Sequence, residues 1–142
     1  MTAADERLLA ALRAEHGAIY AYGALGGHLD AAGLVVASRA ETAHRALRDA
    51  LVLRFTAAGA TPPPAEPAYT LPTPVTDQAG ALKLAVEIEV RTAEIWRAAL
   101  PDTTGADRKL ALDGLSDCAV NAARARRAAG IRPVTIPFPG RP

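Results

Sequence analysis

A glutamate and a histidine three residues apart, Glu41 and His44, are the residue pair best suited to chemistry in this chain. In a helix, that spacing places both side chains on one face, within reach of a single metal ion. A carboxylate and an imidazole are also ligand types that bind iron and manganese. The pair is short, so it predicts a metal site only if the surrounding elements bring further ligands to it.

Three more acidic side chains have the placement that such a site needs. Glu15, Glu89 and Asp117 each fall in a different expected helix. Glu15 and Glu89 interrupt inward rows that are otherwise largely apolar, and Asp117 flanks such a row. A carboxylate in an apolar core is costly unless it has a partner, so these interruptions predict a shared polar site. Residues spaced by three and four form the four rows: Leu8, Leu12, Glu15, Ile19 and Tyr22; Leu34, Ala37, Glu41, His44, Arg48, Leu51 and Phe55; Leu82, Val86, Glu89, Ala93, Trp96 and Leu100; and Ala111, Leu115, Cys118, Ala122 and Ala125.

The four acids also match in height along the helices. Glu15 lies thirteen residues before a turn expected near residue 28, and Glu41 lies thirteen residues after it. Glu89 and Asp117 lie fourteen residues before and after a turn expected near residue 103. At about 1.5 Å of rise per residue, each acid is about 20 Å from its turn. The sequence therefore predicts one metal site halfway along the helices, with the ligands Glu15, Glu41, His44, Glu89 and Asp117.

Four long helices position these residues, and no strand-like alternation of any length separates them. Gly59 and Pro101 mark helix ends, and Asp77 is a good N-cap. Short turns at 28 and 103 make antiparallel pairs. We therefore expect a single all-α domain over residues 1–142, an antiparallel four-helix bundle with helices at about 5–27, 31–58, 77–100 and 103–129.

The connection between the second and third helices is unlike the two turns. Residues 59–76 contain six prolines and cannot form a helix. Such a segment is stiff and extended, at about 3 Å per residue, so it can cross over the length of a bundle. The alternative is a flexible linker between two hairpins, but a lone hairpin has no partner for its apolar face. The tail at 131–142 is also extended and proline-rich, and we expect it on the surface or against a neighbouring subunit.

Composition narrows the class of protein. Half of the 142 residues are hydrophobic, yet no apolar run approaches the roughly 20 residues that span a bilayer. The N-terminal residues lack the features of a signal peptide, and Cys118 is the only cysteine, so we expect a cytoplasmic protein that does not bind membranes. The net charge of +1 gives no reason to expect nucleic acid as a partner. A homo-oligomer, a dimer, is the partnership we expect.

The pattern resembles the ferritin-like superfamily of carboxylate-bridged di-metal proteins. That family places Glu on the first and third helices and Glu-x-x-His on the second and fourth. Glu15, Glu41, His44 and Glu89 match this pattern, and Asp117 stands in place of the last Glu. The whole chain is also similar to a bacterial ferritin-like domain family of uncharacterised function, on the stretches at 14–23, 43–49 and 138–140. The resemblance implies a ferritin-like fold with the long crossover at 59–76.

The chain departs from the family pattern at Val120, which stands where the last histidine should be. Two interpretations follow. In the first, the acids and His44 bind iron or manganese at an incomplete site, and any activity is metal-dependent oxidoreduction. In the second, no metal is bound, and the protein is a structural or small-molecule-binding bundle in which arginines such as Arg48 and Arg124 neutralise the carboxylates.

Overall fold

The computed structural model describes residues 1–142, and its regular elements are helices without any strand. The four α-helices are α1 (Ala3–Leu25), α2 (Ala31–Ala57), α3 (Gln78–Ala99) and α4 (Gly105–Ala129), and a 3₁₀ turn, η1 (Gly26–His28), links α1 to α2. The expectation of an all-α, four-helix protein is confirmed.

Side-chain caps fix where α1, α2 and α3 begin. Thr2 and Asp5 form a capping box, so α1 begins two residues before the expected start. Asp30 and Asp77 each accept a hydrogen bond from the backbone three residues on, at 2.8 and 2.7 Å. The N-terminus of α4 lies two residues later than expected because Thr103 is buried in the turn, where its hydroxyl donates to the Ala99 carbonyl at 2.8 Å.

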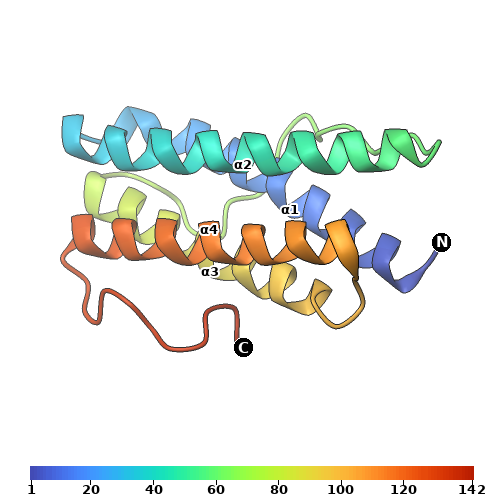
Figure 1. Ribbon diagram of the computed structural model, residues 1–142. Helices are drawn as coiled ribbons and strands as arrows, with labels where there is room; N and C mark the ends of the chain where they lie inside the picture. Colours follow the sequence, from blue (N-terminus) through green and yellow to red (C-terminus); the bar gives the residue numbers. More distant parts are fainter.

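The helices lie lengthwise against one another (Figure 1). Both α1 and α4 pack against α2 and against α3. Residues 58–77, which join α2 to α3, form no helix or strand and lie partly against α1. There the Tyr69 ring packs on Tyr20, with 5.5 Å between the ring centroids. No helix of the chain is both long enough and apolar enough to cross a membrane.

The apolar core is divided into two clusters along the helix axes. One cluster contains Leu8 and Leu12 of α1, Leu51 and Phe55 of α2, and Trp96 of α3. The other is built on residues nearer the opposite ends of the same helices, which include Tyr22, Leu25, Ala37, Leu84 and Ala125. On α1, α2 and α3, one fully buried ionisable residue falls between the two sets, and these three are Glu15, His44 and Glu89. The fold therefore holds a polar level inside an otherwise apolar interior.

Gly114 of α4 packs closely against the Trp96 ring of α3. A Cβ at Gly114 would lie 2.4 Å from two atoms of the Trp96 ring, which is itself fully buried. We expect Gly114→Ala to lower the free energy of unfolding by about 1–3 kcal/mol, since the ring has no free space to move into. Gly23→Ala is the matched control, because that helical glycine has nothing within 4 Å and should gain up to about 1 kcal/mol. Urea denaturation of both variants checks this, and equal stability of the two would contradict the packing described.

Candidate functional site

Glu15, His44 and Glu89 meet in the polar level between the two core clusters. They come from α1, α2 and α3, and all three are fully buried. The His44 ring lies between the two carboxylates. Its Nδ1 is 2.5 Å from Glu15 Oε2, and its Nε2 is 2.7 Å from Glu89 Oε1. The structure thus brings together three of the five residues predicted as metal ligands.

The two carboxylates determine the charge of the ring. Burial lowers the pKa of His44, but the hydrogen bonds and charges of Glu15 and Glu89 outweigh burial and raise the pKa to about 10. A carboxylate accepts but does not donate, so an imidazole between two carboxylates donates from both nitrogens and is an imidazolium. With both carboxylates ionised, the level carries a net charge of −1.

Two aromatic side chains complete the network. Trp96 Nε1 donates to Glu15 Oε1 and the Tyr22 hydroxyl donates to Glu89 Oε1, both at 2.7 Å. The Tyr22 ring also stacks against the His44 ring, with 5.7 Å between centroids. Burial, followed by the charge of Glu89, raises the pKa of the Tyr22 hydroxyl, which therefore stays protonated as a donor. Donors from the apolar core thus orient both carboxylates.

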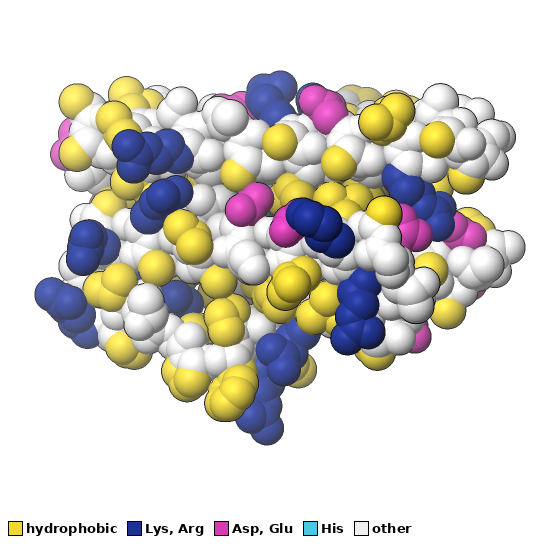
Figure 2. Space-filling model, in the orientation of Figure 1, with side chains coloured by type: hydrophobic (Ala, Val, Ile, Leu, Met, Phe, Trp, Pro, Cys, Tyr) yellow, Lys and Arg dark blue, Asp and Glu magenta, His cyan; other side chains and the backbone are white.

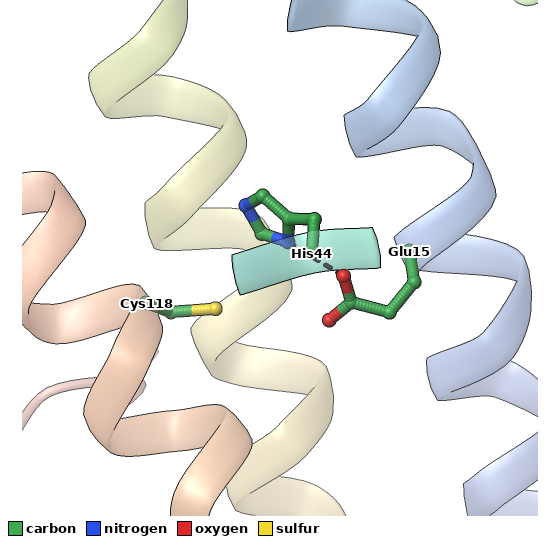
Figure 3. A group of neighbouring side chains, drawn as sticks. All are labelled: Glu15, His44 and Cys118. Atoms are coloured by element: carbon green, nitrogen blue, oxygen red, sulfur yellow. Dashed lines mark hydrogen bonds and ion pairs between the residues drawn. The ribbon is translucent and has the colours of Figure 1, made fainter. Parts of the chain in front are cut away.

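Cys118 of α4 is a further member of this site. One ligand atom from each of Glu15, His44 and Cys118 lies within 4.8 Å of the others, and all three side chains are buried. Figure 3 shows the thiol pointing from α4 toward the His44 ring and the Glu15 carboxylate. Burial, and then the charges of Glu89 and Glu15, raise the pKa of the thiol, so without a metal ion it holds its proton. A carboxylate, an imidazole and a thiol from three helices therefore converge on one point.

Two buried side-chain atoms have no hydrogen-bond partner within the protein. They are Glu89 Oε2 and Asn121 Nδ2. Buried polar atoms are nearly always partnered, so these two atoms differ from the rest of the site. For Glu89 the unpartnered atom is Oε2 alone, because Oε1 accepts from both Tyr22 and His44.

Glu41 and Asp117, the other two predicted metal ligands, do not lie in this cluster. Glu41 lies at the edge of the helix packing, where its Oε1 accepts from Arg45 Nη2 at 2.8 Å. Three residues of helix rotate the chain by about 300°, so Glu41 is about 60° away from the direction of His44. Asp117 is exposed, because α4 instead directs its neighbour Cys118 inward. Val120, which occupies the position of the last histidine in the family pattern, also lies on the surface.

The prediction of arginines neutralising the carboxylates needs correction as well. Arg48 pairs with Asp49 at 2.8 Å on the exterior, and Arg124 is exposed. The cation between the buried carboxylates is His44. His44 takes this role because it lies at the same level as Glu15 and Glu89, whereas Arg48 lies a turn further along α2.

Cys118 and Trp96 belong to this site but were not among the five predicted metal ligands. Both stand in the expected inward rows, Cys118 between Leu115 and Ala122 and Trp96 seven residues after Glu89. The signal for Cys118 is its height, because it lies one residue from Asp117 along the helix and, unlike Asp117, stands in the inward row.

Comparison with known proteins identifies a matching family and a similar solved structure. Residues 7–142 match a family described as a domain of unknown function, DUF4439. Among solved structures, the chain is similar to a conserved hypothetical protein, rv2844, from Mycobacterium tuberculosis. The two are 36% identical with a TM-score of 0.85, over 96% of this chain and 97% of the other. The comparison with curated proteins gave no match.

Proposed function

The chain belongs to the DUF4439 family, and from the geometry of its site we propose that it binds one divalent transition-metal ion through Glu15, His44 and Cys118. The observation that carries the proposal is the convergence of the three ligand atoms within 4.8 Å at full burial. We further propose that the helices have the ferritin-like, antiparallel arrangement with residues 59–76 as the crossover. The placement of the cluster halfway along the helices supports that proposal.

Glu89 has a separate part in this proposal. Glu15 faces Nδ1 of His44, and Glu89 accepts from Nε2. A histidine that binds a metal through one nitrogen usually donates from the other to a carboxylate or a carbonyl, and this bond fixes the orientation of the ring. Glu89 fits that supporting position, and Tyr22 holds Glu89 in turn.

The residues present fit one ion and not two. A carboxylate-bridged pair needs further ligands at the same level, and Glu41 and Asp117 are turned away from it. The thiol also changes the expected metal, because thiolate and imidazole ligands favour zinc or iron(II), whereas manganese prefers carboxylates and water. Such an ion supplies Lewis-acid chemistry if it is zinc and one-electron chemistry if it is iron.

A divalent cation can bind at this position without changing the net charge of the level. His44 and Cys118 both hold protons that a metal ion would displace, since ligands must be deprotonated. With a divalent ion, a neutral His44, the Cys118 thiolate and the carboxylates of Glu15 and Glu89, the net charge would stay at −1. The displaced protons make binding stronger at higher pH, so loading is best tested at pH 8.

Metal content after loading tests the proposal. Metal-free protein is incubated anaerobically with zinc or iron(II), desalted and analysed by elemental mass spectrometry. We expect one ion per wild-type chain, and almost none in Cys118→Ala or His44→Gln. Glu41→Gln and Asp117→Asn are the matched controls, and both should retain the ion because neither side chain reaches the cluster.

Three outcomes would contradict the proposal: a wild-type chain that retains no metal, two ions per chain, or full retention in Cys118→Ala. The Cys118→Ala arm is decisive even if the histidine variant fails to fold, because it removes one sulfur atom and no charge.

A metal-free structural network is the second candidate function. The observation in its favour is that the donors of His44, Tyr22 and Trp96 all have carboxylate partners within the protein. Buried ionic networks of this kind can fix how helices align. The loading experiment separates the two candidates, since the structural network predicts no retained ion in any variant.

A further inference from the structure

A small apolar pocket lies between α3, α4 and the C-terminal tail, which folds back toward the middle of the helices after α4 (Figure 1). Its cavity volume is about 220 Å³, and Figure 2 shows apolar side chains gathered over the same region. Glu89 and Cys118 lie behind its inner wall, since neither has exposed surface, so the buried network offers this pocket no polar atom within reach. Small or apolar side chains form most of the wall, among them Val90, Ala119, Val120, Ala123 and Ile136.

The tail forms the outer wall of this pocket. Gly140 is buried against α3, where a Cβ would lie 2.6 Å from the Ala93 carbonyl oxygen. Arg97 Nη1 also donates to the Pro139 carbonyl at 3.1 Å. The outer wall is therefore held to the helices by specific contacts at its end.

Arg126 of α4 is a charged side chain built into the wall of this pocket. It lines the pocket and is only 8% exposed. Its one hydrogen bond runs from Nη1 to the Val134 carbonyl of the tail, at the long distance of 3.5 Å. None of the ion pairs in the protein includes Arg126. A guanidinium carries five N–H groups, so most of these donors lack a partner, and the charge lacks a counter-charge.

The free donors of Arg126 lie where a small molecule can reach them. The fully enclosed side-chain atoms without a partner are Glu89 Oε2 and Asn121 Nδ2, and no nitrogen of Arg126 is among them. The second arginine of the pocket, Arg141, is in a different state. It is exposed, and its guanidinium lies over the Phe138 ring, 5.7 Å from the centroid. Arg126 is therefore the buried cation of this pocket that a ligand could pair.

The surroundings of Arg126 select the kind of ligand. A nearly buried cation without a counter-ion is costly, and a bound anion offsets that cost. A carboxylate suits a guanidinium because its two oxygens match the planar fork of N–H groups. The apolar wall favours a ligand whose remaining part is apolar as well. The net negative charge of the buried network lies elsewhere, since Arg126 follows Cys118 by eight residues, about 12 Å along α4.

We propose that this pocket binds a small monocarboxylate with an apolar body, whose carboxylate accepts from Arg126 while the body packs among the small side chains of α3 and α4. An apolar cavity of about 150 Å³ is large enough for benzene, so this one accepts a single ring or a short alkyl chain. The proposal uses none of the three ligand atoms of the metal proposal, and it holds whether or not a metal ion binds.

A matched series of three probes tests the proposal. Phenylacetate and phenylacetamide have nearly the same shape and differ in charge, whereas acetate has the charge without the ring. We expect phenylacetate to bind wild-type protein about tenfold more tightly than phenylacetamide, because only the carboxylate pairs with the guanidinium. Acetate should bind at least about tenfold more weakly than phenylacetate, because it buries no ring. Amide chemical-shift changes in an NMR titration should centre on residues 89–93, 118–126 and 135–141, which form the pocket.

Three variants separate the charge from the cavity. Arg126→Gln should remove the preference for phenylacetate, while phenylacetamide binds as it does to wild type and so reports that the pocket is still formed. Arg127→Gln is the matched control, because it removes the same charge from the exposed neighbouring residue and should keep the preference. Ala123→Leu fills the cavity and should abolish binding of both ring-containing probes.

Four outcomes would each overturn the proposal. They are the absence of phenylacetate binding at millimolar concentration, equal affinity for phenylacetate and phenylacetamide, a preference that survives in Arg126→Gln, and unchanged binding to Ala123→Leu.

Discussion

Replacing His44 by leucine is expected to lower the free energy of unfolding at pH 7 by about 3–5 kcal/mol, the cost of removing one partner from a buried ion pair. The variant keeps an apolar side chain in the space but leaves Glu15 and Glu89 buried with no cation between them. Urea or thermal denaturation of the metal-free protein measures the change. Glu41→Ala is the control, because its exposed pair with Arg45 is worth only about 0.5 kcal/mol.

Acidification tells whether the loss comes from charge or from packing. If uncompensated carboxylates cause it, the difference between His44→Leu and wild type should shrink as the pH falls far enough to protonate glutamate. A difference that does not change with pH would assign the effect to shape alone. A loss no larger than that of Glu41→Ala would contradict the buried network itself.

The metal-free protein is expected to lose stability as the pH rises from 7 to 9. The folded pKa of His44 is about 10, above the ordinary value of 6.5, so the folded state keeps a proton that the unfolded chain releases. Such a group stabilises the fold fully below about pH 6.5, and its contribution disappears as the pH rises through 10. The expected loss is about 1 kcal/mol for each pH unit in this window.

Urea denaturation at several pH values measures this slope. Cys118 and Tyr22 also have raised pKa values, but their unfolded forms ionise near pH 9 and 10, so they add little below pH 9. His44→Leu should show no comparable slope between pH 7 and 9. A wild-type stability that stays flat or rises across this range would show that His44 is not held as an imidazolium.

The helices were predictable because their signals are local. Asp77 caps α3 as expected, and Gly130 ends α4 in the left-handed conformation that glycine adopts most easily. The inward rows were also predictable, since Glu15, His44 and Glu89 lie at positions where spacing by three and four directs side chains to the core.

The composition of the site was less predictable, because it depends on how far each helix is rotated. One residue along a helix changes the direction of a side chain by about 100°. The rotation of α4 therefore decides whether the Asp117 carboxylate or the Cys118 thiol faces inward. Similarly, His44 and Glu41 share a broad face of α2, but only His44 enters the core, while Glu41 finds Arg45 at the surface. The spacing of residues predicts well how far along the helix axis a side chain lies. It predicts the direction of the side chain around the axis only to within one face of the helix.

The cobalt(II) absorption spectrum is the most direct measurement of the central claim, that Glu15, His44 and Cys118 together hold one metal ion. Cobalt(II) substitutes for zinc, and a thiolate ligand produces an intense charge-transfer band in the near ultraviolet. We predict that wild-type protein at pH 8 shows this band together with the visible bands of a four-coordinate ion, saturating at one equivalent. Cys118→Ala should lose the charge-transfer band. A spectrum equal to that of cobalt(II) in buffer, or one that Cys118→Ala leaves unchanged, would contradict the assignment.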